Sequence, residues 1–555
     1  MLTRWNFQNK SFRIILLCIL LLVQCGLIFF YGGQKTNFFV DEYLTYTFAN
    51  YKGGFLSDED GFIDSWQEGK KFHDALTVQA EERFHFDIAL ENNKKDDHPP
   101  LYHYMLHFLS SLHLDSFSKW DGIIPNMLFC GMSTLMLYSL AAWILKGNYA
   151  GAMAVTIVWA LSMGVISFAI FIRMYTMMAF FCIWQGRILM SALDELDCKK
   201  FSARILAEFL VCTMLGISSH YYFIIVSFFL CGCLWILLLI QKKWFMLFQY
   251  TVTGFGAVLI ANIFIAPNMI HQLFLGRQGS NVASNIANAD FLKMVVEGGH
   301  EIDKNIFGGL GVELLGLLAV LLSVFILKHT VSKYRRGNTG AICIKVKIPS
   351  EITVAITPRK VGLLILIFTV IGYVSVISFV APWVAARYFM CIFGFVVVSI
   401  FSSLVFIMRK LELRMVTQNK VLMLLAVILI GTNYGTQAMP NTYTWYNVRS
   451  VVQQYNNYPA IVINDTGSDN NADAWINEYQ NYSAVFRSKT NDDLAGLDTA
   501  YGSKDLSDGF CLYIVSFDYT KDNEDKLFEK IQQHIPIRQH TLLTDMDGYV
   551  YFCEV

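Results

Sequence analysis

The sequence has little charge for its length. Only 16% of its 555 residues are charged and 55% are hydrophobic, whereas soluble chains have about 25% charged and about 45–50% apolar residues. A larger soluble core would explain a small excess, but not repeated apolar runs of about 20 residues with basic ends. The composition therefore excludes an ordinary soluble protein and predicts a polytopic membrane protein. The net charge of −1 carries no signature of nucleic-acid binding, and we expect no nucleic-acid partner.

Signatures of common cofactor and metal sites are also missing. No Walker or dinucleotide-binding glycine loop occurs where it would matter, and no Cys/His spacing resembles a zinc site. Ten of the twelve cysteines lie in apolar runs or in segments assigned to the cytoplasm, where small buried side chains are expected. Cys511 and Cys553 lie in an exported tail, each on a predicted strand, so a disulfide and two free thiols remain equal alternatives.

About eleven apolar runs are candidates for membrane spans. They cover residues 14–30, 123–145, 149–171, 174–193, 205–222, 223–240, 245–267, 306–327, 361–380, 388–408 and 421–434. The first run follows basic residues but precedes no small-residue cleavage site, so we expect a retained span, with a cleaved signal as the minor alternative. The run 101–112 is short and carries His103 and His107, which favours an interfacial or re-entrant helix.

Loop charge sets the predicted orientation. With the N-terminus inside and 101–112 not crossing, almost all basic loop residues fall on the cytoplasmic side, including the cluster within 328–360. The short outer connections contain almost nothing basic except Arg173 and Arg387. We therefore predict a multi-pass protein of the plasma or inner membrane, most simply a bacterial inner membrane, with the N-terminus inside and the C-terminus outside.

Two large segments are then extracytoplasmic. The first is the loop 32–121, in which fourteen Asp/Glu face seven Lys/Arg between Gly33 and Asp97. The second is the tail, where strand-like runs at 460–465, 511–517 and 549–555 accompany a helical pattern at 523–534. We expect an all-α transmembrane module over 1–436, including the loop, and a small extracytoplasmic α/β domain over 437–555.

Titratable residues gather at both ends of the acidic loop. "DHPPLY" (97–102) precedes the short apolar run, and proline suits the first turn of a helix because the missing N–H would be unpaired there. Asp41 and Glu42 stand just beyond the first span. Adjacent carboxylates also suit a solvated helix start, where the helix dipole favours them, and for an isolated loop that explanation would be preferred.

Three further polar elements at the same membrane face weaken that explanation. They are Arg173-Met174-Tyr175, His220-Tyr221-Tyr222 and Arg387-Tyr388, each at the predicted outer end of a span. An arginine can anchor a helix end by snorkelling, but an arginine set in apolar sequence is costly and usually functional. Guanidinium groups suit phosphate because they present paired donors. Together these residues predict a pocket for an amphiphile with an anionic headgroup, with a carboxylate as general base.

In these elements the sequence resembles the GT-C class of integral-membrane glycosyltransferases. The resemblance is strongest to the branch of protein O-mannosyltransferases and the aminoarabinose transferase of lipid A. It rests on the order and spacing over residues 1–410 of Asp41-Glu42, "DHPPLY", Arg173-Met174-Tyr175, His220-Tyr221-Tyr222 and Arg387-Tyr388. The "DE" and "DHPPLY" elements are fairly specific, whereas each of the others is weak alone.

The resemblance implies a reaction and residue roles. Such enzymes transfer a sugar, with inversion, from a polyprenyl-phosphate carrier to an extracytoplasmic acceptor, which here is unknown, and they work among membrane lipids. Asp41 would deprotonate the acceptor and Glu42 would shape the site, while Arg173 and Arg387 would contact the carrier phosphate. Other substrate-binding positions carried over are Asp97, His98, Tyr102, Tyr175, His220, Tyr221 and Tyr388. No cofactor is required in this branch, although a divalent cation shared by Asp41 and Asp97 remains an option.

Two other functions remain as alternatives. A transporter or flippase of lipid-linked sugars would also present arginines to phosphate, but it would place polar residues near the bilayer midplane on discontinuous helices. Here the predicted spans are nearly uncharged, with Arg187 and Glu208 as mild exceptions. A surface scaffold needs only an anchor in the membrane, and about eleven spans are far more than an anchor requires. The sequence therefore favours a glycosyltransferase over both.

Overall fold

The structure is a computed structural model of the chain. It describes residues 7–36, 38–96, 98–274, 284–286, 290–335, 342–346, 357–436, 452–466, 469–488, 494–516, 524–545 and 548–555. Its contacts separate into two compact units. Unit 1 comprises Met1–Phe30, Asn126–Ala169 and Met174–Asn441, and unit 2 comprises Tyr31–Pro125, Ile170–Arg173 and Thr442–Val555. The acidic loop, which the sequence pattern groups with the spans, thus shares unit 2 with the tail.

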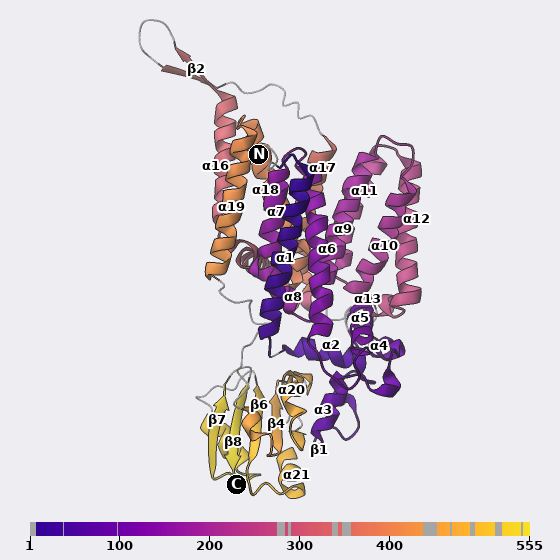
Figure 1. Cartoon of the computed structure of the whole chain (residues 1–555), viewed down its shortest axis with the longest axis vertical. Coiled ribbons are helices and arrows are strands. Elements are labelled where there is room, and N and C mark those ends of the chain that lie inside the picture. Colours follow the sequence, from indigo (N-terminus) through magenta and orange to yellow (C-terminus); the bar gives the residue numbers. More distant parts are fainter. Residues whose placement is uncertain are drawn as a thin grey trace. The chain divides into compact units, whose positions relative to one another are not determined.

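Unit 1 is a bundle of helices (Figure 1). Its helices are α1 (Lys10–Gln34), α6 (Trp120–Ile144), α7 (Tyr149–Leu161), α8 (Met163–Ile170), α9 (Tyr175–Asp194), α10 (Ala203–Ser219), α11 (Phe223–Ile240), α12 (Trp244–Ile260), α13 (Met269–Phe274), α15 (Phe291–Ile302), α16 (Gly311–Thr330), α17 (Pro358–Val380), α18 (Ala386–Lys410) and α19 (Met415–Thr436). One end of α1, of α6 and of α8 belongs to unit 2. The π-helical turns η4 (Ala261–Ile265) and η5 (Asp303–Phe307) extend α12 and α15, and β2 (Val331–Arg335) pairs with β3 (Ile342–Val346).

The predicted apolar runs correspond to these helices. In the described part of the chain, eight helices are long and apolar enough to cross a membrane, or up to ten spans if each of two bent helix pairs counts as one. α10 is a predicted span that falls outside this set, because it has 17 residues. The prediction of a multi-pass membrane protein is confirmed. The exact number of spans and their orientation stay predictions.

Burial within unit 1 distinguishes central from peripheral helices. In α9 and α18, 83% and 67% of the apolar stretch is buried, whereas in the span formed by α12 and η4 only 17% is. Large apolar side chains on the peripheral helices are open to the surroundings, as in Phe228 (69% exposed) and Phe255 (75% exposed). Such side chains on helices of this length suit lipid better than water.

Two of the predicted spans are broken rather than straight. The run 149–171 forms α7 and α8, bent by 48° at Ser162. Asn433 on α19 accepts the N–H of Met163 at 2.6 Å, which satisfies a backbone donor that the break frees. The run 306–327 contains a 91° turn between α15 and α16, where Gly308 and Gly309 take φ of +65° and +88°. Glycine adopts this left-handed conformation without a steric penalty.

Unit 2 contains a six-stranded mixed sheet with the order β1-β5-β4-β6-β8-β7. Its strands are β1 (Trp66–Gln67), β4 (Ala460–Asp465), β5 (Val485–Ser488), β6 (Phe510–Ser516), β7 (Gln539–Thr544) and β8 (Tyr549–Glu554). The parallel core β5-β4-β6 is flanked by antiparallel β1 on one side and by β8 and β7 on the other. Figure 1 shows β4, β6, β8 and β7 side by side. This confirms the small C-terminal α/β sheet expected from the sequence.

Helices cover both faces of the sheet. The short helix η8 (Asp469–Trp475) and α20 (Ile476–Tyr479) connect β4 to β5, and α21 (Gly496–Ser503) connects β5 to β6. Because β5 and β6 lie on opposite sides of β4, right-handed crossovers place these connections on opposite faces. Leu497 of α21 and Phe528 of α22 (Glu524–Ile531) pack in one apolar cluster with Leu512, whereas Trp475 and Tyr479 pack against Tyr513.

The strand register rules out the disulfide alternative. In the antiparallel pair β6–β8, Cys511 lies opposite Phe552, and Cys553 lies opposite Phe510. Successive strand residues point to opposite faces of a sheet, so the two cysteine side chains lie on different faces. Both are buried free thiols. The position of both cysteines in the predicted exported tail left the two alternatives equal, and the strand register decides between them.

The acidic loop adds short helices to unit 2. They are α2 (Val40–Asn50), η2 (Leu56–Asp58), α3 (Gly69–Leu76), η3 (Ala80–Glu82), α4 (Phe86–Asn92) and α5 (Leu101–Ser110). α2 packs against α3, α4 and α5. α5 has ten residues, or about 15 Å of helix, which is too short to cross a bilayer. The predicted non-crossing helix at 101–112 is therefore present.

Candidate functional site

Glu42 is a buried carboxylate with three hydrogen-bond donors around it. It occupies the first turn of α2 and is fully buried. Its Oε2 accepts from the backbone N–H of Phe39 at 2.7 Å and from Nζ of Lys35 at 3.0 Å. Its Oε1 accepts from the N–H of Ile172 at 2.8 Å. Burial raises the pKa of Glu42 and lowers that of Lys35, and their mutual attraction opposes both shifts.

Asp41 precedes Glu42 but has different surroundings. Its side chain is only partly buried, and its carbonyl oxygen accepts from Oγ1 of Thr45 at 2.8 Å and from Nη1 of Arg173 at 3.2 Å. The two adjacent carboxylates therefore divide into a buried one, committed to an ion pair and two backbone donors, and a more accessible one. A general base must reach its substrate, and Asp41 fits that requirement better than Glu42.

Arg173 reaches α2 because Glu42 binds the residue before it. Arg173 is buried, with 5% of the residue exposed. Nη1 also donates to Oγ1 of Thr45 at 2.9 Å, and Nη2 lies 3.2 Å from Nε2 of His98. The structure thus brings together four residues from three distant parts of the sequence. We call Asp41, Glu42, His98 and Arg173 the loop cluster.

"DHPPLY" is only partly described. Asp97 lies outside the described residues, so its predicted role stays untested. His98 is 23% exposed, and its Nδ1 lies 2.9 Å from Oδ1 of Asp96. Asp96 is not among the residues predicted from the sequence, which pointed to its neighbour Asp97. Its spacing of two residues from His98 was the available signal.

Tyr102 lies inside unit 2 and holds two of its helices together. It is fully buried, and its hydroxyl donates to the carbonyl of Gly122 in the first turn of α6 at 3.3 Å. His103 and His107, predicted on one face of the same helix, are also buried. Burial lowers the pKa of His103 to about 4, and Asp96 opposes that shift. This helix face packs within unit 2.

A second group of predicted residues meets in unit 1. The rings of Tyr175 and His220 lie 5.3 Å apart, those of His220 and Tyr222 4.8 Å apart, and those of Tyr222 and Tyr388 5.4 Å apart. The guanidinium carbon of Arg387 lies 5.5 Å from the Tyr388 ring centre. These residues stand at the ends of α9, α10, α11 and α18. We call them the helix-end cluster.

Tyr221 belongs to neither cluster. Its hydroxyl makes a very short hydrogen bond to Oε1 of Gln272 on α13, and both residues are buried. Tyr222, which was not among the predicted binding residues, takes the place between His220 and Tyr388. The sequence offered three adjacent aromatic rings, and only the turn between α10 and α11 decides which of them face each other.

The described part of the chain contains no clustered set of potential metal ligands. Within those residues no three His, Cys, Asp or Glu side chains are grouped so that they could hold a metal ion. The option of a cation shared by Asp41 and Asp97 involves a residue outside this part and stays a prediction.

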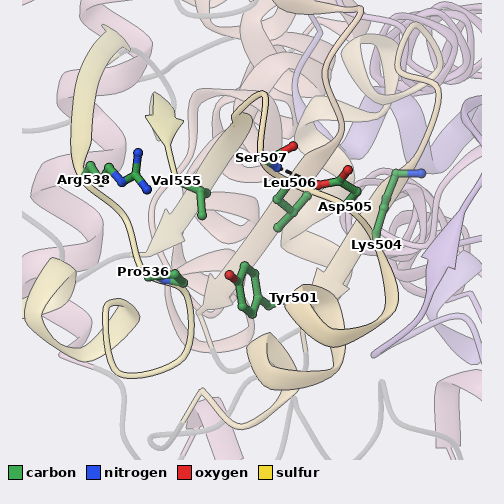
Figure 2. A pocket seen from close by; sticks show the side chains of 8 residues that line it. All are labelled: Tyr501, Lys504, Asp505, Leu506, Ser507, Pro536, Arg538 and Val555. Atoms are coloured by element: carbon green, nitrogen blue, oxygen red, sulfur yellow. Dashed lines mark hydrogen bonds between the residues drawn. The ribbon is translucent and has the colours of Figure 1, made fainter.

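The tail contains a cavity of about 490 Å³ that includes none of the predicted site residues. Figure 2 shows Lys504, Asp505 and Arg538 around it, together with Tyr501 and Ser507. The N–H of Ser507 donates to Oδ1 of Asp505 at 3.0 Å and thereby lowers the pKa of that carboxyl. The cavity combines cationic, anionic and aromatic groups at its wall.

Comparison with known proteins supports the fold. No family model matches the sequence, and no curated protein is similar to it in sequence. A solved structure, ArnT from Cupriavidus metallidurans bound to undecaprenyl phosphate, is similar with a TM-score of 0.53 at 11% identity, over 99% of each chain. The chain therefore has the fold of ArnT, which is the GT-C architecture predicted from its sequence.

Proposed function

We propose that this protein is an inverting glycosyltransferase that uses a polyprenyl-phosphate-linked sugar and an extracytoplasmic acceptor. The acceptor oxygen attacks the anomeric carbon from the face opposite the phosphate, and a new C–O bond forms. The bond between that carbon and the phosphate oxygen breaks, and its electron pair leaves with the polyprenyl phosphate. Asp41 takes the acceptor proton.

The observation that carries this proposal is the unequal burial of Asp41 and Glu42. Glu42 is fully buried and engaged by Lys35 and two backbone N–H groups, whereas Asp41 is only partly buried. Two adjacent carboxylates that merely started a solvated helix would both face water. One buried anchor beside one accessible carboxylate is the arrangement that a positioned base requires.

The two predicted arginines supply the second part of the argument. Arg173 and Arg387 are both more than nine-tenths buried, and a buried guanidinium suits an anionic group that remains bound while the reaction proceeds. Charge on the leaving phosphate grows in the transition state, so a buried arginine beside it would stabilise it. The fold likeness to ArnT, whose solved structure contains undecaprenyl phosphate, favours a polyprenyl-phosphate carrier over other phosphorylated lipids.

The proposal extends to the branch of the class and to the acceptor. The branch of protein O-mannosyltransferases and lipid A aminoarabinose transferase is our choice within the class, and protein, lipid headgroup and wall polymer are all candidate acceptors. The proposal needs no cofactor. In an alternative form of the mechanism, Asp41 and Asp97 share a divalent cation. That form predicts loss of activity when a chelator is added.

Asp41→Asn tests the proposed base. Mass spectrometry of envelope glycans with and without the protein first identifies the sugar and acceptor. With that pair, release of undecaprenyl phosphate by the purified chain should fall at least about 100-fold in Asp41→Asn, while binding of undecaprenyl phosphate is retained because the amide has the same shape. Asp87→Asn, an exposed carboxylate of the same loop (73% side-chain exposure), is the matched control.

The same assay separates transfer from transport. A glycosyltransferase breaks the sugar–phosphate bond and produces free undecaprenyl phosphate, whereas a transporter would leave the lipid-linked sugar intact. Full activity in Asp41→Asn would reject Asp41 as the base. Movement of intact donor across vesicles, without release of undecaprenyl phosphate, would replace the proposal with a flippase.

A further inference from the structure

His98 lies between a carboxylate and a guanidinium. Its Nδ1 is 2.9 Å from Oδ1 of Asp96, and its Nε2 is 3.2 Å from Nη2 of Arg173. A carboxylate only accepts hydrogen bonds and a guanidinium only donates them. The two partners therefore fix one neutral tautomer, in which Nδ1–H donates to Asp96 and the Nε2 lone pair accepts from Arg173.

Asp96 is well suited to hold that tautomer. It is 11% exposed at its side chain, and its Oδ2 lies 3.8 Å from Nε2 of His103. Burial raises its pKa, but His98, His103 and Arg173 outweigh burial and hold the pKa of Asp96 well below its ordinary value. The carboxylate therefore stays ionised and remains an acceptor for His98.

The contacts of Arg173 commit part of its guanidinium and leave part available. Nη1 donates to the carbonyl of Asp41 and to Oγ1 of Thr45, and one N–H of Nη2 donates to His98. Nε is buried and has no hydrogen-bond partner in the described part of the chain. A buried donor without a partner is costly. Nε and Nη2 share one edge of the planar guanidinium, where two oxygens of one phosphate can accept together.

We propose that Asp96 and His98 are positioning residues that orient Arg173 so that its Nε edge faces the carrier phosphate. This inference rests on the proposed function, in which Arg173 binds that phosphate. His98 acts through Arg173, and Asp96 acts through His98 by fixing the tautomer. Without the histidine acceptor, the guanidinium loses one of three contacts that hold it, and its free edge turns away from the ligand.

Binding of undecaprenyl phosphate to the purified full-length chain measures this arrangement. His98→Ala should weaken binding at least about tenfold, the effect of losing a hydrogen bond to a charged group. His98→Gln should restore most of the affinity, because its amide oxygen can accept from Arg173. Asp96→Asn should weaken binding, because its amide can donate to Nδ1 and place the proton on Nε2 instead, facing Arg173. Asp87→Asn should change nothing.

Combining the variants tests whether Asp96 acts through His98. In the His98→Gln background no ring tautomer remains to be fixed, so Asp96→Asn should cost less affinity there than in the wild-type chain. The midpoint of thermal unfolding of each variant identifies any that fail to fold. If His98→Ala does not fold, the affinities of His98→Gln and Asp96→Asn for undecaprenyl phosphate test the proposal instead. His98→Gln should then bind more tightly than Asp96→Asn, and the reverse order would overturn the positioning role.

The outcomes separate this inference from the proposed function. If the wild-type chain does not bind undecaprenyl phosphate, both are overturned. If it binds, and His98→Gln is as weak as His98→Ala, or His98→Ala binds normally, the positioning role is overturned and the carrier proposal stands. Equal losses from Asp96→Asn in both backgrounds would show that Asp96 does not act through His98, which also overturns it.

Discussion

Oε1 of Glu42 accepts the backbone N–H of Ile172 at 2.8 Å, across 130 residues of sequence. The next residue after Ile172 is Arg173, whose guanidinium donates to the carbonyl of Asp41, the residue before Glu42. The buried carboxylate thus anchors the segment that carries the arginine, while its neighbour remains more accessible. Glu42 is therefore a structural anchor for the loop cluster, and the two adjacent acidic residues have different surroundings.

Glu42→Gln should destabilise the protein, whereas Asp41→Asn should not. The glutamine leaves Lys35 charged and fully buried without its ion-pair partner, and breaking a buried pair costs about 3–5 kcal/mol. The midpoint of thermal unfolding in detergent should fall by several degrees in Glu42→Gln and stay near wild type in Asp41→Asn. Equal midpoints in the two variants would contradict the anchor role.

Removing both charges should cost less than the single changes suggest. Lys35→Met alone leaves the Glu42 carboxylate buried with only backbone donors, and Lys35→Met with Glu42→Gln removes both uncompensated charges. We expect a favourable coupling of about 0.5–3 kcal/mol in a double-mutant cycle on the free energy of unfolding. Strict additivity would show that the ion pair contributes nothing specific.

His103 should make the protein acid-sensitive. Its pKa is lowered by burial to about 4 in the folded chain, against about 6.5 in the unfolded chain. Between these values the unfolded state binds a proton that the folded state does not, so stability falls as the pH falls, by up to about 3 kcal/mol. Above about pH 6.5 the effect is absent.

His103→Phe should remove this loss, because an aromatic ring can still pack against Phe48, whose ring centre lies 6.0 Å from that of His103. The drop in unfolding midpoint between about pH 7.5 and about pH 5 should be smaller in His103→Phe than in wild type. His85→Gln, at a histidine with 57% side-chain exposure, is the control and should behave as wild type. An unchanged drop in His103→Phe would assign the acid sensitivity to other groups.

The architecture was largely predictable from the sequence because the length of an apolar run must match the thickness of the membrane that it crosses. The breaks within spans were not predictable. At the bend after Ser162, the freed N–H of Met163 donates to Asn433, which lies 270 residues further along the chain. Likewise, predicted strands gave Cys511 and Cys553 the right setting for a disulfide, but only the register of β6 and β8 decides on which face each side chain lies.

The sequence pointed to several residues that the structure brings together in the loop cluster and the helix-end cluster, but it did not indicate their individual surroundings. The sequence pointed to Asp41 and Glu42 together, and burial separates them. It also pointed to Asp97 and His98, whereas the described partner of His98 is Asp96. Adjacent residues of one type have the same composition and the same local propensity. Their different roles come from tertiary contacts that no local pattern encodes.

Orientation in the membrane is the prediction on which the extracytoplasmic site depends. The positive-inside rule predicts that 328–360 lies in the cytoplasm and the acidic loop outside. In a chain whose twelve native cysteines are replaced, an impermeant maleimide added to intact cells should label Lys94→Cys, whose native side chain is 55% exposed. It should label Gly337→Cys only after the membrane is opened. The reverse pattern would invert the topology and remove the proposed outer-face mechanism.

Gly122 provides a steric test of the segment that positions Arg173. A Cβ at this residue would overlap Cγ2 of Ile172 and lie 3.0 Å from its Cβ and Cγ1. Ile172 cannot retreat freely, because its N–H is bound to Glu42. Gly122→Ala should therefore displace the segment 170–173, at an overpacking cost of about 1–3 kcal/mol, and lower both undecaprenyl phosphate binding and transfer.

Two further substitutions serve as the rescue and the control for Gly122→Ala. Ile172→Ala in the same chain removes the overlapping atoms and should restore binding, although the single Ile172→Ala change only deletes packing. Gly131→Ala, in the same helix α6, meets nothing closer than Cδ2 of Leu21 at 3.7 Å and should behave as wild type. If Gly122→Ala binds normally, or if Ile172→Ala fails to rescue it, the placement of Arg173 does not depend on this contact, and the role assigned to Glu42 as its anchor loses its steric support.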